Sequence, residues 1–304
     1  MDAITAGRLV RRVDALAADM TPRQIDRRVL RREWIVLRRG VYLTGDLGEP
    51  RTVLLDRAAA ALHRLGDAVI SHETAALIHG FKVLVEPAAI LATRPLSATR
   101  SPACYPLLRV RTAGLVAADV VEMDGIRVTN AARTIADVAR CATFRAGVVT
   151  ADLALHAANV SKDDVRLVLG GCVRWPGVRR ARDVVDFADG LAESPHESVS
   201  RVVLVREHGV PAPELQVVLG DDTGTTARVD MLWRAQRTIG EADGMSKYTS
   251  PEVLRAEKLR QEWLEEDVQY GVVRWTPLQI GGHPERVVRR IYASFDRNSL
   301  DLTG

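Results

Sequence analysis

An arginine-rich segment near the N-terminus constrains what this chain can form more than any other feature. Thr21 and Pro22 are a strong helix start, because the threonine hydroxyl can cap the first turn and proline fits the first helical position. The spacing of apolar residues predicts a helix that runs to about Glu33, with Ile25 and Val29 on its buried side. Most residues on the other faces of this helix are arginines.

A basic hairpin is predicted directly after this helix. Residues 34–37 and 41–43 are short β-rich runs separated by an Arg-Arg-Gly turn. An arginine-faced helix followed by a basic hairpin fits a DNA duplex, with the helix in the major groove and the hairpin on phosphates. The alternative is a solvated charged face without a partner. The predicted DNA-binding residues are Arg23, Arg27, Arg28, Arg31, Arg32, Arg38 and Arg39.

The stretch 21–45 resembles the winged helix-turn-helix of AbiEi-family antitoxins, which belong to type IV toxin–antitoxin systems. The string Arg-Arg-Gly-Val-Tyr at 38–42 carries most of this resemblance. Such domains usually have a further helix before the pair, whereas only residues 1–19 precede it here. The resemblance implies a transcriptional regulator or antitoxin that binds double-stranded DNA and controls a cognate toxin.

Residues 49–190 are predicted to form a mixed α/β domain that ends in a helical linker. Helices are expected over 51–65, 72–79, 130–140, 145–158 and 162–169, with a strand over 83–92 broken at Pro87. Asp124-Gly125 is a strong signal for a two-residue hairpin turn. The segments 71–77 and 125–134 resemble AbiEi-type proteins, which implies an α/β effector domain.

His72-Glu73 has the start of a zinc-protease motif but not its end. The second histidine is required at position 76, where Ala76 stands, and His79 has poor spacing for a shared metal. We therefore expect both histidines to be structural.

Residues 191–304 are predicted to follow the order α-β-β-β-α-β-α. Strands are expected over 214–219, 226–233, 238–242 and 270–276, and helices over 194–208, 250–267 and 284–295. If Trp233 pairs with Thr238, then Asp230 lies opposite Glu241. Asp243 shares this face because strand side chains alternate. Oxygen-rich clusters of this kind favour Mg²⁺ or Mn²⁺.

This segment resembles the PD-(D/E)XK nuclease superfamily, near the very-short-patch repair endonucleases. The resemblance implies a restriction-endonuclease-like α-β-β-β-α-β domain with Asp230 and Glu241 as metal ligands and Glu197 as an accessory acid. Asp243 stands where the superfamily has lysine, for which Lys247 or Lys258 would have to substitute. The candidate catalytic residues are Glu197, Asp230, Glu241, Asp243 and Lys247.

Each candidate acid also has a plainer interpretation. Ser194-x-x-Glu197 is a capping box, in which Glu197 only closes a helix start. Asp230 and Glu241 could be cross-strand polar residues that face solvent. Asp243-Gly244 is also typical turn chemistry.

Composition and charge agree with a cytoplasmic protein. The chain has 304 residues and a net charge of +3. Its three cysteines (Cys104, Cys141 and Cys172) form no C-x-x-C pair and are expected to be reduced thiols. The start of the chain lacks the apolar core of a signal peptide, and no run approaches the roughly 20 apolar residues of a membrane span, so no membrane partner is expected.

The sequence thus predicts an α/β multidomain protein with three domains. These are a winged helix-turn-helix at 1–48, an AbiEi-like α/β domain at 49–190 and a nuclease-like domain at 191–304. The expected function is a DNA-binding regulator or antitoxin. The alternatives are a metal-dependent DNA endonuclease targeted by its winged helix, and an interaction protein that uses the nuclease-like fold as a scaffold.

Overall fold

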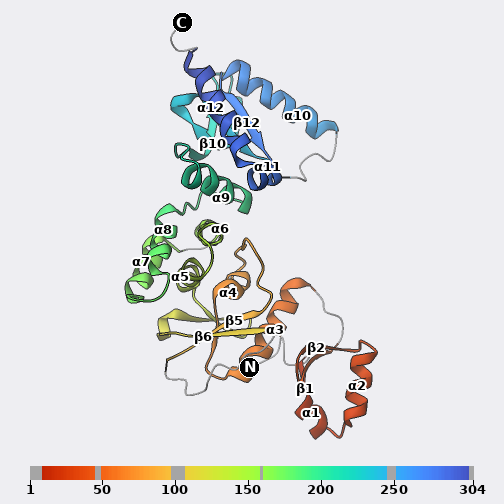
Figure 1. Cartoon of the computed structure of the whole chain (residues 1–304). Coiled ribbons are helices and arrows are strands. Elements are labelled where there is room, and N and C mark those ends of the chain that lie inside the picture. The colour runs from red at the N-terminus through yellow and green to blue at the C-terminus, as the bar shows by residue number, and fades with distance from the viewer. Residues whose placement is uncertain (1–8, 45–48, 97–106, 158–159, 245–250, 301–304) are drawn as a thin grey trace. The chain divides into compact units, whose positions relative to one another are not determined.

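The computed structural model describes residues 9–44, 49–96, 107–157, 160–244 and 251–300. The chain divides into two compact units, Met1–Thr150 with Ala158–Val185, and Ala151–Ala157 with Asp186–Gly304 (Figure 1). Its helices and three separate sheets confirm the expected mixed α/β class. None of the helices in the described ranges combines the length and the apolar character needed to cross a bilayer.

The first unit begins with a small helix-and-sheet module. It contains β1 (Leu9–Arg11), α1 (Arg12–Ala17), α2 (Pro22–Leu30), β2 (Trp34–Arg38) and β3 (Val41–Thr44). The strands form an antiparallel sheet in the order β1-β3-β2. The two helices pack on this sheet through a core that contains Ala15, Ile25, Trp34 and Tyr42.

Helix α2 begins as predicted and ends earlier than predicted. Thr21 and Gln24 cap each other reciprocally at its start. The helix was expected to reach Glu33, but it ends at Leu30 because Arg32 takes a left-handed backbone with φ of 58°. The N–H of Arg32 donates to the Val29 carbonyl, and the N–H of Glu33 donates to the carbonyl of Arg28. This is a Schellman motif with arginine at the position that glycine usually occupies.

The rest of the first unit is a five-stranded mixed sheet with helices. Its strands run in the order β6-β5-β4-β8-β7, and β4–β8 and β5–β6 are the parallel pairs. The elements are α3 (Pro50–Leu65), β4 (Val69–Ile70), α4 (His72–Ile78), β5 (Ile90–Arg94), β6 (Leu108–Thr112), β7 (Val120–Met123), β8 (Ile126–Thr129), α5 (Ala131–Cys141), α6 (Phe144–Ala157), α7 (Lys162–Gly171) and α8 (Val178–Phe187). Helix α6 runs from the first unit into the second.

Two local predictions in this unit have opposite outcomes. The hairpin at Asp124-Gly125 is confirmed: both residues have positive φ, 49° and 71°, between β7 and β8. The strand predicted over 83–92 is wrong in its bounds, because β5 spans Ile90–Arg94 and the residues around Pro87 are irregular. Proline has no N–H for the ladder, so regular pairing begins only beyond it.

The second unit has the element order predicted from the sequence. It contains α9 (Pro195–Arg201) with a π-helical turn at 202–207, β9 (Glu214–Gly220), β10 (Thr226–Trp233), β11 (Thr238–Ala242), α10 (Pro251–Glu262) with a π-helical turn at 263–267, β12 (Gly271–Trp275), α11 (Pro277–Gly282) and α12 (Pro284–Leu300). The short helix α11 was not predicted. The sheet order is β12-β11-β10-β9, in which β11 and β12 run parallel.

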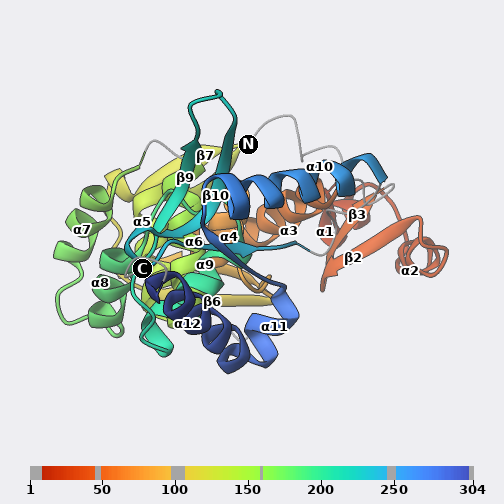
Figure 2. The ribbon, with the colours of Figure 1, turned by 90° about the horizontal axis from the view of Figure 1, so that it is seen from above.

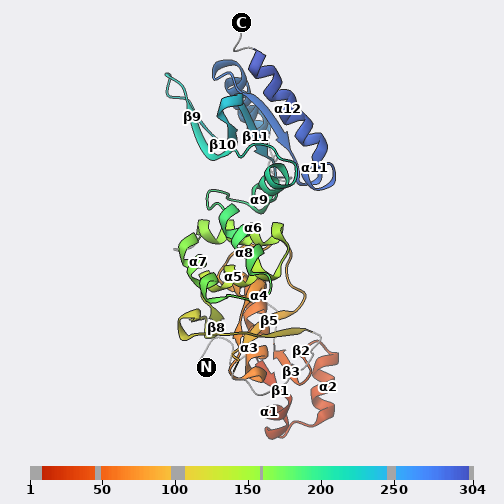
Figure 3. The same cartoon turned by 60° about the vertical axis from the view of Figure 1, so that its left-hand side comes forward.

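Each face of this sheet buries an apolar cluster. One cluster includes Met231, Trp233, Trp275 and Ile291. Helix α12, which carries Ile291, lies along this face of the sheet (Figure 3). The other includes Ile239 and Leu264, which belong to β11 and to the turn after α10. The sheet is therefore covered on both faces. Beyond these layers, β9 and β10 continue as a long hairpin (Figure 2).

Gly240 on β11 is required by close packing. A Cβ atom placed there would lie 2.7 Å from the ring of Trp275 and 2.8 Å from the ring of Trp233. Both rings are buried, so neither can move away without opening the core. Any side chain at this position would therefore disrupt the cluster under α12.

The left-handed residue after α2 leads to a stability prediction. Arg32→Gly is expected to stabilise the end of α2 by about 1 kcal/mol, because glycine adopts positive φ without the steric cost that arginine carries. The change should slow hydrogen exchange of the α2 amides. The matched variant Arg31→Gly, at a residue with ordinary φ, should speed that exchange. Equal effects of the two variants would contradict this account.

Candidate functional site

Helix α2 presents a surface of exposed arginines. Its one fully buried side chain is Ile25, which anchors the helix to the sheet and leaves the other faces in solvent. Within the described residues, Arg23 and Arg27 have no carboxylate partner, whereas Arg31 lies 3.9 Å from Glu33. The exposed arginines of this segment are Arg23, Arg27, Arg28, Arg31 and Arg32.

The β2–β3 hairpin lies beside this helix. Its turn is formed by Arg39 and Gly40, and Gly40 has φ of 78°. Arg39 is exposed, and the backbone of Arg38 pairs with Val41 after a bulge. The side chain of Arg38 lies outside the described part of the structure.

Two contacts hold α2 and the hairpin in place. The guanidinium of Arg28 lies 5.4 Å from the ring centre of Trp34 at the start of β2. Arg12 donates to the hydroxyl of Tyr42 at 3.1 Å and to Asp26 at 3.3 Å, which connects α1, β3 and α2. These contacts attach the arginine-bearing helix to the sheet that forms the hairpin.

A hollow of about 360 Å³ separates α2 from the hairpin. Its apolar rim is unusual for a surface this charged, since Leu30 is 84% exposed and Val36 is 49% exposed. The lining residues are Asp26, Val29, Leu30, Val36, Arg39, Gly40 and Tyr42. The surface thus offers apolar contacts next to cationic ones.

The register of the strands that carry the candidate acids is the predicted one. Met231 pairs with Gly240 and Trp233 with Thr238, so the expected pairing of β10 and β11 is confirmed. Asp230 lies next to β11, where its Oδ2 accepts the N–H of Ala242 at 2.9 Å. The structure therefore brings the carboxyl groups of Asp230 and Glu241 to adjacent strands.

Arginines compensate the charge of Glu241. The residue is 5% exposed, and its carboxylate accepts from Arg260 at 2.6 Å and pairs with Arg274 at 3.0 Å. Arg274 also lies 3.9 Å from Asp243. The sequence did not indicate either pairing, because Arg260 comes from α10 and Arg274 from β12, both far from Glu241 along the chain.

Glu257 extends this network on α10. It pairs with Arg260 at 3.0 Å and accepts a short hydrogen bond from Arg274. Burial opposes its charged form, but the two arginines outweigh burial and lower the pKa of Glu257. Burial also opposes the charge of Arg274, yet its ion pairs with Glu241 and Glu257 raise the pKa of that guanidinium. Glu257 and Arg274 are therefore held in their charged forms.

In this arrangement the acidic cluster does not fit a divalent metal ion. Both oxygens of Glu241 are engaged by guanidiniums, and Asp230 is engaged by a backbone N–H. Among the described residues, no group of three His, Cys, Asp or Glu side chains could hold a metal. The predicted Mg²⁺ or Mn²⁺ site at Asp230 and Glu241 would require these arginines to move away.

The remaining candidate acids have structural partners. Glu197 accepts from the Ser194 hydroxyl at 2.6 Å, from the N–H of Glu193 and from the amide of Gln216 at 2.9 Å. Its own N–H donates to the Ser194 hydroxyl oxygen at 3.2 Å, so Ser194 caps α9. The carboxylate accepts from the N–H of Glu193 and not, as the predicted capping box requires, from that of Ser194. The carboxylate oxygens of Glu197 are thus engaged at the start of α9. Lys247 lies outside the described residues.

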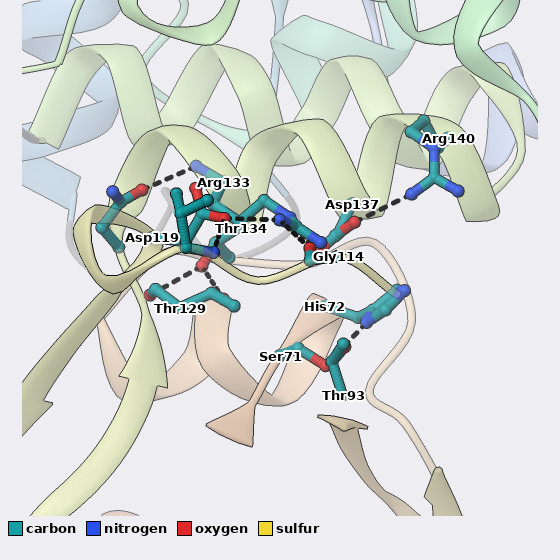
Figure 4. A network of polar contacts seen from close by, with 12 residues as sticks. Ser71, His72, Thr93, Gly114, Asp119, Thr129, Arg133, Thr134, Asp137 and Arg140 are labelled. Atoms are coloured by element: carbon teal, nitrogen blue, oxygen red, sulfur yellow. Dashed lines mark hydrogen bonds and ion pairs between the residues drawn. The ribbon is translucent and has the colours of Figure 1, made fainter. Parts of the chain in front are cut away.

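A buried ion network in the first unit was not anticipated from the sequence (Figure 4). Arg133 on α5 pairs with Asp119 at 2.8 Å and with Asp137 at 2.9 Å. Arg140 pairs with the other oxygen of Asp137 at 2.9 Å. The ring of Trp175 covers both guanidiniums, at 5.0 and 4.7 Å. The spacing of these charges along one otherwise apolar helix was the available signal.

His72 lies beside this network in a strained backbone conformation (Figure 4). It is the first residue of α4 but has φ of 56°, which is rare for a residue with a Cβ. Its Nδ1 lies 2.8 Å from the hydroxyl of Ser71, which also accepts from Thr93 at 2.8 Å. Burial lowers the pKa of His72 to about 4, although the nearby Asp137 opposes this. The imidazole is therefore neutral at pH 7.

Comparison with known proteins gives the chain a family. No family model matches it. It is 30% identical over 285 residues to two proteins of Mycobacterium tuberculosis, uncharacterized protein MT2308 of strain CDC 1551/Oshkosh and uncharacterized protein Rv2248 of strain ATCC 25618/H37Rv. The match covers 91% of this chain and 98% of each of those proteins. The chain belongs to the family of these two mycobacterial proteins.

One solved structure has a weaker likeness. The RV2827C protein of Mycobacterium tuberculosis is 15% identical to this chain, with a TM-score of 0.42 over 70% of this chain and 84% of that one. A likeness of this size does not define a common fold.

The buried histidine leads to a prediction for pH dependence. The pKa of His72 is about 4 in the fold and 6.5 unperturbed, so the folded state binds fewer protons than the unfolded state. The stability from this group is present above pH 6.5 and is lost as the pH falls toward 4. We expect it to contribute a loss of about 2 kcal/mol between pH 7.5 and 5.0.

Urea unfolding at these two pH values measures this loss. His72→Asn is the informative variant, because asparagine tolerates left-handed backbone and does not titrate. The variant should be less sensitive to acid than the wild type by that amount. The same pH response in both proteins would show that another group is responsible.

Proposed function

We propose that this chain is a DNA-binding transcriptional regulator or antitoxin of the type IV toxin–antitoxin kind. The observation that carries the proposal is the exposed arginine surface of α2 beside a basic hairpin. In this proposal α2 enters the major groove of double-stranded DNA, and the hairpin contacts the phosphates. Leu30 and Val36 at the hollow between them offer apolar contacts of the kind that the thymine methyl group takes.

The order of elements in this module supports a winged helix-turn-helix. Two helices lie between β1 and the β2–β3 hairpin, and β3 lies centrally in the sheet. Over the described residues from Leu9 onward, this order is that of a winged helix from its first strand to its wing. The contacts of Arg12 and Arg28 hold the proposed recognition helix against its wing, which favours binding without rearrangement.

The middle of the chain supports the antitoxin part of the proposal through its resemblance to AbiEi-type proteins. The two resembling segments form the start of α4 and the hairpin that leads into α5. The buried network around Arg133 and Asp137 makes this region a rigid body. A cognate toxin is the proposed partner of this region. Cys141 and Cys172 are free thiols, which fits the cytoplasm.

A second candidate function is metal-dependent DNA cleavage by a PD-(D/E)XK nuclease-like domain. It is favoured by the placement of Asp230 and Glu241 on adjacent strands within an α-β-β-β-α-β order. Cleavage would require a state in which Arg260 and Arg274 release Glu241. We therefore put regulation first and treat the nuclease-like domain as a folded module of doubtful activity. The scaffold interpretation remains as a third candidate.

The proposed recognition helix is tested by charge removal. Arg23→Gln combined with Arg27→Gln should weaken duplex binding and reduce the slope of log K against log salt by about 1.8. Each phosphate that no longer meets an arginine keeps its counterion, so fewer ions are released on binding. Fluorescence anisotropy of a labelled duplex across a salt series measures both quantities. The paired Arg→Lys variant keeps the charge and should keep the slope. Unchanged binding in the glutamine variant would show that α2 is not the recognition helix.

The two candidate functions are separated by one set of samples. Wild type and Asp230→Ala are incubated with plasmid DNA, with and without Mg²⁺ or Mn²⁺, and both retention and cleavage are recorded. We expect salt-sensitive retention without cleavage, equal in the two proteins. Metal-dependent cleavage by the wild type alone would establish the nuclease instead.

A further inference from the structure

Helix α12 in the second unit carries a second stripe of exposed arginines. Arg286, Arg290 and Arg297 are all exposed, and their spacing of four and seven residues places them within about 40° of one another around the helix axis. The stripe is about 16 Å long at 1.5 Å per residue. Arg289 is also exposed, next to this stripe.

The opposite side of α12 fixes the orientation of this stripe. Val287, Ile291 and Phe295 are buried in the cluster that also contains Trp233 and Trp275. Ser294 is fully buried and lies 3.0 Å from the hydroxyl of Thr238. Because the helix is held along its whole buried side, the stripe cannot turn inward.

The three arginines of the stripe have no carboxylate partner among the described residues, whereas five other arginines of this unit do. Arg201 pairs with Asp152 in the interior. Four more arginines pair with glutamates: Arg228 with Glu193, Arg234 with Glu214, Arg260 with Glu241 and Glu257, and Arg274 with Glu241 and Glu257. Those arginines have structural partners, whereas the guanidiniums of α12 are available to another molecule.

The surroundings of the stripe separate the two signs of charge. The acids of α12 that are exposed, Glu285 and Asp296, lie about 80° to 100° around the helix from the stripe. At the far end of the stripe, Arg297 and Arg237 line the same cavity of about 690 Å³, which Glu265 and Glu266 also border. The exposed acids of α12 therefore do not interrupt the stripe between Arg286 and Arg297. At Arg297 the stripe reaches a cavity lined by both arginine and glutamate.

We propose that the arginine stripe of α12 binds the phosphate backbone of duplex DNA, as a contact surface separate from α2. The partner chemistry follows from charge complementarity: a row of guanidiniums on one side of a packed helix fits a row of phosphates. Because the proposed contact is with phosphates and not with base edges, it is independent of base sequence. The second unit thus adds affinity for DNA, whatever the activity of its acidic cluster.

The competing explanation is protection of a sheet edge. Strand β12 is an edge strand of its sheet, and α12 packs beside it. Charged side chains commonly keep such edges from pairing with another chain. This explanation predicts self-association, not weaker DNA binding, when the arginines are removed.

The test uses the full chain and a 30-base-pair duplex of mixed sequence. The triple variant Arg286→Gln, Arg290→Gln, Arg297→Gln is measured by fluorescence anisotropy across a salt series. We expect affinity to fall about tenfold or more and the slope of log K against log salt to fall by about 2 to 3. The same loss should occur when the triple change is added to Arg23→Gln with Arg27→Gln, since the two surfaces are separate.

Two controls make the result specific. The Arg→Lys triple keeps the charge and should keep the slope, and Glu285→Gln with Asp296→Asn should strengthen binding. Thermal melting of each variant checks that the fold is intact, which is expected because glutamine and arginine have similar helix propensities. An unchanged slope and affinity in the folded glutamine triple would overturn the proposal. Concentration-dependent association of that variant in sedimentation would then assign the stripe to edge protection.

Discussion

A buried guanidinium must meet a counter-charge, and this requirement organises both units of the protein. In the first unit Arg133 is 2% exposed and is shared between Asp119 and Asp137. In the second unit Arg201 meets Asp152 with two hydrogen bonds. Removing one partner of such a pair leaves an uncompensated buried charge, at a typical cost of about 3 to 5 kcal/mol. These pairs tie distant segments together with little tolerance for rearrangement.

The same requirement separates structural charges from those that face a partner. Glu241 was a candidate metal ligand because carboxylates gathered on one face need a cation. In the structure the cations are guanidiniums from α10 and β12. On α2 and α12, by contrast, arginines stand exposed without such partners among the described residues. The proposed DNA contacts therefore rest on these exposed arginines and not on the acidic cluster.

Turn residues and short loops in the sequence predicted the structure around them well. Contacts between residues far apart in the sequence were not predicted. Asp124-Gly125 defined a hairpin because two positive φ values are needed there, and the hairpin loop after Trp233 set the register of β10 and β11. The pairing of Glu241 with Arg274 depends instead on the parallel placement of β12, which no nearby residue specifies. The bounds of β5 failed for a related reason, since only tertiary pairing decides which part of an apolar run becomes a strand. The metal site and the DNA surface stay predictions.

Gly240 has a consequence for how the acidic face is oriented. A slip of β11 by one residue would put the side chain of Ile239 or Glu241 into the space between Trp233 and Trp275, where even a single methyl group does not fit. The glycine therefore sets the register of β11, because it can only lie between the two rings when Glu241 faces α10. A residue without a side chain thus determines which way a charged neighbour points.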